Sequence, residues 1–172
     1  ATRHQDASVK LIDLDPQATS SESLKRFCDR RFSVVNDSGL NLDDGAPNNE
    51  KIIQLIDAER NNKFKKRFVV VDSPAGTQPH RSAFLFQCDI MLIPTSVSDA
   101  DIFATKKYLA GLHALFSQHE YRHTFAPPAL IVLPNLVDSR DEFNELRHAL
   151  AREQVYLGKP LYYSPAFRRA FR

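Results

Sequence analysis

The stretch VKLIDLDPQATSS, residues 9–21, decides the fold class of this chain. A run of apolar residues ends in two carboxylates, Asp13 and Asp15, and Pro16 with a hydroxyl-rich segment follows at once. An acid at the end of an apolar strand costs free energy unless it pairs with a cation, accepts hydrogen bonds or stays hydrated. The stretch therefore predicts a buried strand with a site at its carboxyl end.

Three further apolar runs have the same character: RFVVVDSP (67–74), CDIMLIPT (88–95) and PALIVLPN (128–135). Each is nearly continuous in apolar residues, which is typical of strands covered on both faces. Helical patterns lie between the runs and predict helices over 21–32, 48–61, 98–118 and 140–153. This alternation predicts an α/β fold, a doubly wound and mostly parallel sheet with helices on both faces.

Composition and length are those of an ordinary globular chain. The 172 residues are 42% hydrophobic and 26% charged, so we expect a single domain over 1–172, incomplete at both ends. The net charge of +2 neither favours nor excludes a polyanionic partner. No apolar stretch approaches the roughly 20 residues of a transmembrane segment, and no signal-peptide core is present, so we expect a cytoplasmic protein.

Polar side chains follow three of the predicted strands. They are Asp13 with Asp15, then Asp72, and finally Asn135. In an open parallel sheet, ligands bind at the carboxyl ends of the strands. Because Mg²⁺ is commonly held by one or two carboxylates, waters and phosphates, the three acids predict a magnesium and phosphate site. For each Asp alone, a helix cap or a turn remains the alternative.

Five stretches together resemble, in order and approximate spacing, the ParA/MinD family of deviant-Walker P-loop ATPases: VKLIDLDPQATS, FVVVDSPAGT, CDIMLIPTSVSDADIFAT, LIVLPNLVDSR and YYSPAFRRAF. DLDPQATS fits best the branch that partitions plasmids and chromosomes. The resemblance implies an ATP hydrolase that binds ATP and Mg²⁺ as a homodimer. It also implies a nucleoid-associated protein that binds DNA non-specifically and whose ATP hydrolysis is stimulated by a centromere-binding or ParB-like activating protein.

The resemblance also implies roles for particular residues. Asp13 and Asp72 would lie at the metal, and Asp15 would be the catalytic residue that positions or polarises the attacking water. The cofactor-binding residues would be Gln17, Asn135, which would read the adenine, and Pro165 in the loop that covers the base. The two switch loops would contain Pro16, Thr19 and Ser20 in the first and Ser73, Pro74, Ala75 and Gly76 in the second.

One part of the family pattern is absent from these residues, because no G-x-x-x-x-G-K-[ST] phosphate loop occurs in them. Either the chain is the remainder of a longer ATPase, or it is a nucleotide-free adaptor that has kept the fold. We expect the former, since both switch acids are present. A MinD-like positioning ATPase is a further alternative to the partition ATPase.

Two other motifs indicate different chemistry. DLDPQ partly matches the nucleophile loop of haloacid-dehalogenase-like phosphatases, but Gln17 stands where that loop needs Thr or Val. HEYRH, residues 119–123, matches the zinc-protease motif H-E-x-x-H, although Pro127 and Pro128 would stop its helix almost at once. We expect it to be the solvated end of a helix.

Basic residues near the chain end are candidates for contact with DNA phosphates. They lie beside aromatic residues, and they are Lys159, Arg168, Arg169 and Arg172. An amphipathic helix with a basic outer face is the alternative.

Overall fold

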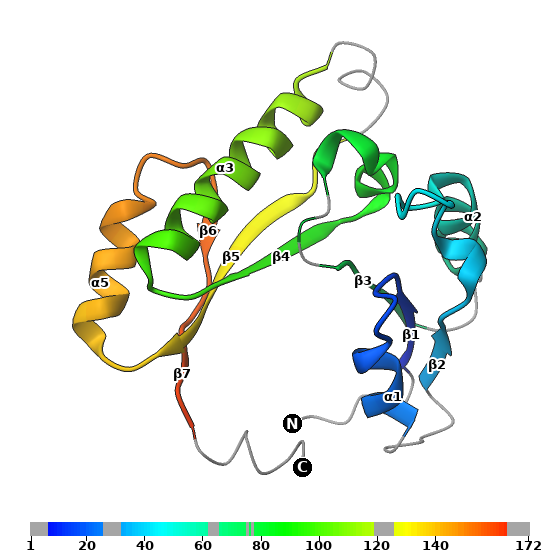
Figure 1. The fold of residues 1–172 in the computed structure, drawn as a ribbon, viewed down its shortest axis with the longest axis horizontal. Helices are drawn as coiled ribbons and strands as arrows, with labels where there is room; N and C mark the ends of the chain where they lie inside the picture. The colour runs from blue at the N-terminus through cyan, green and yellow to red at the C-terminus, as the bar shows by residue number, and fades with distance from the viewer. Residues whose placement is uncertain are drawn as a thin grey trace. The chain divides into compact units, whose positions relative to one another are not determined.

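The computed structural model describes residues 7–25, 32–61, 66–74, 76, 78–118 and 126–164. The chain divides into two compact units, Ala1–Phe84 and Leu85–Arg172, each built on its own parallel sheet (Figure 1). Each unit is described by itself below, and the expectation of a single domain over 1–172 stays a prediction.

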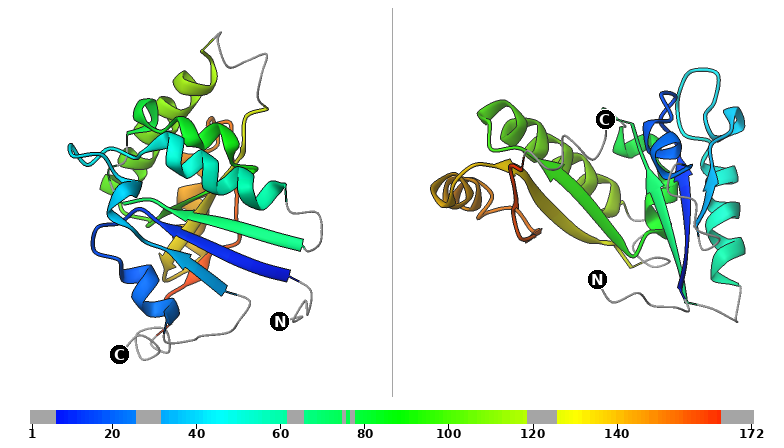
Figure 2. Two further views of the ribbon diagram at one scale, coloured as in Figure 1. Left: turned by 90° about the vertical axis from the view of Figure 1, so that its right-hand side faces the viewer. Right: turned by 90° about the horizontal axis from the view of Figure 1, so that it is seen from below.

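The first unit contains a three-stranded sheet in the order β2-β1-β3, and Figure 2 shows these strands side by side. The strands are β1 (Ala7–Asp13), β2 (Phe32–Val35) and β3 (Lys66–Asp72). The helices are α1 (Thr19–Lys25) and α2 (Asn49–Arg60), with short 3-10 turns η1 (Ser38–Leu40) and η2 (Pro79–Arg81). A third turn, η3 (Ala83–Gln87), spans the boundary between the units.

Helices α1 and α2 contact side chains on opposite faces of β1. Successive side chains of β1 point to opposite faces. Lys10 forms an ion pair with Glu59 of α2, whereas the Asp13 carboxylate accepts hydrogen bonds from Ser21 of α1. The core between these layers includes Ile12 and Ile52, both fully buried. The alternating pattern of the strand thus separates the α1 face from the α2 face.

The second unit contains strands β4 (Ile90–Thr95), β5 (Ala129–Val137), β6 (Tyr156–Leu157) and β7 (Leu161–Tyr162). All pairings within it are parallel, in the order β4-β5-β6 with β7 also beside β5. The long helix α3 (Asp99–Phe116) is linked to β4 by a buried hydrogen bond of 2.8 Å, which Thr105 of the helix donates to Thr95 of the strand. Helix α5 (Arg140–Ala149) follows β5 and buries Leu146.

Apolar side chains on β3 and β4 are incompletely covered by the described residues. Phe68 and Val70 on β3 are 57% and 49% exposed, and Ile90 and Leu92 on β4 are 57% and 62% exposed. Within the described part of the chain, β3 pairs with β1 alone and β4 with β5 alone. These side chains belong to strands whose apolar pattern predicts cover on both faces.

The structure confirms the α/β fold with parallel sheets, and the four apolar runs form β1, β3, β4 and β5. The helix predicted over 21–32 is wrong at its end, because Phe32 begins β2 and pairs with Val9 of β1. The helices predicted over 98–118 and 140–153 end earlier, at Phe116 and Ala149. HEYRH and the closing FRRAFR lie outside the described residues.

Candidate functional site

The candidate site lies where β1 and β3 end side by side in the first unit. Asp13 and Asp72 are direct partners in the strand register, and the Leu14 amide donates to the Asp72 carbonyl at 2.9 Å. The two acids predicted to share a sheet edge therefore do share it. Asp15 lies two residues beyond Asp13, at the start of the turn into α1.

Asp13 is almost completely buried, with 1% of its surface exposed. Its Oδ2 accepts hydrogen bonds from the Ser21 amide at 2.9 Å and the Ser21 hydroxyl at 2.6 Å, and its Oδ1 accepts one from the Asp15 amide at 3.1 Å. A buried carboxylate requires such donors. Asp13 therefore ties the first turn of α1 to the end of β1 and holds the backbone of Asp15.

Asp15 is half-buried and organises the turn that follows it. Its Oδ1 accepts a hydrogen bond from the Gln17 amide at 2.9 Å, and its carbonyl accepts one from the Ala18 amide at 2.9 Å. Among the described residues, none donates a hydrogen bond to its Oδ2. Gln17 is exposed, and Ala18 has a φ of 53°, which an L residue rarely adopts. One carboxylate oxygen of Asp15 thus holds the turn, and the other accepts no hydrogen bond from the described residues.

Asp72 connects the two predicted switch segments. Its Oδ2 accepts a hydrogen bond of 2.5 Å from the Ser20 hydroxyl of α1. After Asp72 the chain continues through exposed Ser73 and half-buried Pro74 to Gly76, whose φ of 83° suits glycine. Of the second segment, Ala75 lies outside the described residues. Ser20 and Asp72 thereby link one segment directly to the other.

The donor set fits a hydrated Mg²⁺. Asp72 and the Ser20 hydroxyl are hard oxygen donors at an accessible strand end, and Mg²⁺ usually combines one or two such ligands with waters and phosphates. In the described part of the chain, no group of three His, Cys, Asp or Glu side chains could hold a metal ion by itself. The carboxylate oxygens of Asp13 already accept three hydrogen bonds, so in this conformation Asp13 holds the backbone of Asp15 and Ser21 in place. Direct binding of the metal by Asp13 stays a prediction.

The remaining predicted residues belong to the second unit. Asn135 lies near the end of β5 at a register shift, and its Oδ1 accepts a hydrogen bond of 3.0 Å from the Leu136 amide. Leu136 has a φ of 56°. Lys159 is exposed. Their roles in binding adenine and DNA stay predictions, and the residues predicted beside them, Pro165, Arg168, Arg169 and Arg172, lie outside the described residues.

Three residues that form hydrogen bonds at this site were not among the site residues predicted from the sequence. Ser21 supplies two of the hydrogen bonds to Asp13. Asn36 donates through Nδ2 to the Asp13 carbonyl at 3.1 Å, and Asn41 donates to the Leu14 carbonyl at 3.0 Å. The available signal was the asparagine-rich loop over 36–50, because polar loops beside strand ends often carry function.

The mostly parallel α/β fold of this chain is similar to that of solved structures named McdA, partition protein and ParA-family ATPase. McdA from Cyanothece in its apo form aligns over 97% of this chain and 79% of its own, with a TM-score of 0.61 and 17% identity. A structure named partition protein aligns over 96% of this chain and 60% of its own, with a TM-score of 0.56 and 22% identity. A ParA-family ATPase from Chlorobium tepidum aligns over 95% of this chain and 74% of its own, with a TM-score of 0.62 and 13% identity.

These likenesses confirm the predicted resemblance to the ParA/MinD family at the level of the fold. An ATP complex of a McdA variant from Cyanothece is also similar, with a TM-score of 0.60 and 16% identity over 95% of this chain and 75% of its own. No family model and no curated protein sequence matches the chain. None of the described helices is long and apolar enough to span a membrane.

Proposed function

We propose that this protein is a ParA-like ATPase that binds ATP and Mg²⁺. The observation that carries the proposal is the placement of Asp13 beside Asp72 at the ends of two adjacent parallel strands, with the Asp15 amide held by the Asp13 carboxylate. Solved structures with the same fold include a ParA-family ATPase and an ATP complex of McdA. The phosphate loop that such an activity requires is not among these 172 residues, so the full-length protein is the material for every test.

Asp15 would orient and polarise the water that attacks the terminal phosphate. Its Oδ1 is held by the Gln17 amide, which leaves Oδ2 directed by a fixed backbone turn. Asp72 and Ser20 would hold the hydrated metal ion, and Mg²⁺, when bound, would offset the charge of the phosphates. Catalysis of this kind depends mainly on positioning and charge neutralisation, which a rigid strand end provides.

The bond between Ser20 and Asp72 supports a switching role. Ser20 lies in α1 and Asp72 ends β3, so a change at the phosphates would act on both segments at once. In the proposed cycle ATP stabilises a homodimer, and an activating protein of the centromere-binding or ParB-like kind stimulates hydrolysis. The family resemblance and the names of the similar structures support this cycle.

We propose that the protein binds DNA non-specifically during this cycle and moves or positions DNA. It would then be a cytoplasmic protein associated with the nucleoid. Lys159 is the described candidate for phosphate contact, with Arg168, Arg169 and Arg172 beyond the described residues. Contacts with phosphates release counterions, so binding that is unchanged between low and high salt would contradict this part of the proposal. A MinD-like positioning ATPase predicts ATP hydrolysis without this DNA affinity.

The variant Asp15→Ala tests the catalytic assignment. We expect the rate of ATP hydrolysis to fall by at least about 100-fold while ATP affinity is retained, because Asp15 acts on the water. Asp43→Ala, which removes an exposed carboxylate of the 36–50 loop in the same unit, is the matched control and should hydrolyse ATP normally.

Two results would contradict the proposal. Hydrolysis that is unchanged in Asp15→Ala would remove Asp15 from catalysis. A full-length protein that neither binds nor hydrolyses ATP would favour the nucleotide-free adaptor.

A further inference from the structure

Two asparagine side chains cap the end of β1. Beyond the register pair of Asp13 and Asp72, the strand ladder stops and its last carbonyls need other partners. Asn36 Nδ2 donates to the Asp13 carbonyl at 3.1 Å, and Asn41 Nδ2 donates to the Leu14 carbonyl at 3.0 Å. The residue directly after these two carbonyls is Asp15.

The hydrogen bonds around this point fix the backbone from both sides. The Leu14 amide donates to the Asp72 carbonyl, and the Asp15 amide donates to the Asp13 carboxylate. With Asn36 and Asn41 on the carbonyls, each backbone polar group between the Asp13 carbonyl and the Asp15 amide has a partner. Leu14 itself is fully buried, so the strand end is held by packing as well.

The segment that carries Asn41 is itself firmly placed. Asn41 forms an antiparallel bridge with Pro47, flanked by backbone hydrogen bonds of 2.7 Å from Leu42 to Ala46 and 2.8 Å from Asn48 to Leu40. Further anchorage comes from side chains that are almost or fully buried, and these are Leu40 and Ala46.

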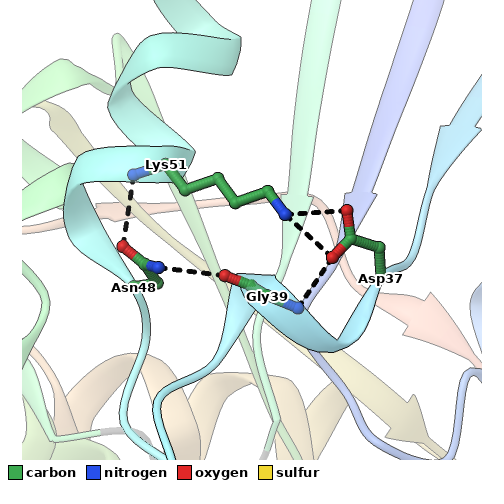
Figure 3. A network of polar contacts seen from close by, with 4 residues as sticks. All are labelled: Asp37, Gly39, Asn48 and Lys51. Atoms are coloured by element: carbon green, nitrogen blue, oxygen red, sulfur yellow. Dashed lines mark hydrogen bonds and ion pairs between the residues drawn. The ribbon is translucent and has the colours of Figure 1, made fainter.

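A polar network holds the beginning of the same segment (Figure 3). Lys51 Nζ contacts both carboxylate oxygens of Asp37 at 2.8 Å, and Asp37 also accepts the Gly39 amide at 2.7 Å. Asn48 Oδ1 accepts a hydrogen bond from the Lys51 amide, and Asn48 Nδ2 donates one of 3.0 Å to the Gly39 carbonyl. The amides of Asn36 and Asn41 therefore come from a preorganised support, which is what accurate placement of a reacting group requires.

We infer that Asn36 and Asn41 are positioning residues for Asp15, acting through the carbonyls of Asp13 and Leu14. Neither side chain is hydrogen-bonded to the Asp15 carboxylate in the structure. They set the direction in which the chain leaves β1 and hence the place of the Asp15 carboxylate. The consequence for turnover rests on the proposed ATPase function, whereas the effect on the backbone does not.

The test uses the full-length protein with Asn36→Ala and Asn41→Ala. The matched control is Asn61→Ala at the exposed C-cap of α2, where the same side chain is removed away from the strand end. Hydrogen exchange of the 14–18 amides reports placement of the turn without nucleotide. These are the amides of Leu14, Asp15, Gln17 and Ala18, because Pro16 has none. The rate constant for hydrolysis and the dissociation constant of ATP are measured in parallel.

In Asn41→Ala we expect exchange of the 14–18 amides to rise at least about 10-fold above the control, with α3 amides unchanged. The hydrolysis rate should fall at least about 10-fold while the dissociation constant of ATP changes less than about 2-fold. Asn36→Ala should act in the same direction. A merely structural role would raise exchange throughout the first unit and weaken ATP binding together with turnover.

Unchanged exchange over 14–18 in both variants would overturn the inference. Raised exchange with an unchanged hydrolysis rate would overturn it as well, because the turn would then be misplaced without consequence. A parent protein that does not hydrolyse ATP would refute the proposed function instead, and the exchange comparison alone would then decide the role of the two asparagines.

Discussion

Replacing Ser21 by Ala removes one of the three hydrogen bonds that hold the buried carboxylate of Asp13. The Ser21 hydroxyl donates to Asp13 Oδ2 at 2.6 Å, and both residues are essentially buried, with 0% and 1% of their surface exposed. The amides of Ser21 and Asp15 still reach the carboxylate in the variant, at 2.9 and 3.1 Å. The variant therefore isolates a single contact of the anchor between β1 and α1.

The size of the effect follows from the charge on the acceptor. A hydrogen bond to a charged group contributes about 1.5–3 kcal/mol to stability, and water cannot replace it at a buried site. Ala has a higher helix propensity than Ser by roughly 0.5 kcal/mol, which partly hides the loss. Ser23→Ala gains the same propensity in the same helix, and no hydrogen bond of the Ser23 side chain is formed among the described residues. Ser21→Ala should thus be about 2 kcal/mol less stable than Ser23→Ala.

Urea denaturation followed by circular dichroism measures this difference. The midpoint should fall in Ser21→Ala with the slope against urea unchanged, because the same surface is exposed on unfolding. If the two variants agree within about 0.5 kcal/mol, the Ser21 hydroxyl does not stabilise the Asp13 carboxylate, and the reasoning about this contact is refuted. A changed slope would show that the comparison of the two folded states fails.

Two further predictions concern stability. The hydrogen bond from Lys10, and to a smaller extent that from Arg67, holds the pKa of Glu59 below its ordinary value of 4.5. The stability that these ion pairs contribute is therefore present above pH 4.5 and is lost as the pH falls through the folded pKa. Glu59→Gln should lower the free energy of unfolding at pH 7 by about 1 kcal/mol and shrink its fall toward acid, and a parallel pH profile would contradict this. Thr105→Val removes the donor of the 2.8 Å buried bond to Thr95 and should cost about 1 kcal/mol in urea denaturation, whereas an unchanged midpoint would show that the pair contributes nothing.

The apolar runs predicted most of the fold because buried parallel strands leave a continuous signal in the sequence. Strand β2 left no such signal, since it has four residues and its first, Phe32, is 45% exposed. Its position depends on pairing with β1, which lies 23 residues earlier in the register of Val9 with Phe32. A short strand of this kind is determined by its neighbour and not by its own periodicity.

The acids of the candidate site could be located from the sequence, but their connections could not. Strand ends placed Asp13 and Asp72 at one sheet edge, as the register shows. The sequence could not indicate that the Ser21 hydroxyl would donate a hydrogen bond to the Asp13 carboxylate. Nor could it indicate that Asn41 would donate one to the Leu14 carbonyl, 27 positions away. Hydrogen bonds between a loop side chain and a distant backbone group have no period or motif, so they become visible only in three dimensions.

The backbone at Ala18 restricts which amino acids this position can hold. Its φ of 53° costs about 1–2 kcal/mol for a residue with a Cβ, and glycine would adopt it without that penalty. Branched side chains such as Val, Ile and Thr are the least compatible with it. Position 18 is therefore restricted by its backbone conformation, whereas the role that we propose for Asp15, three residues earlier, depends on its carboxylate. Engineered forms of this stretch should therefore accept glycine at position 18, whereas the proposed catalytic role requires a carboxylate at position 15.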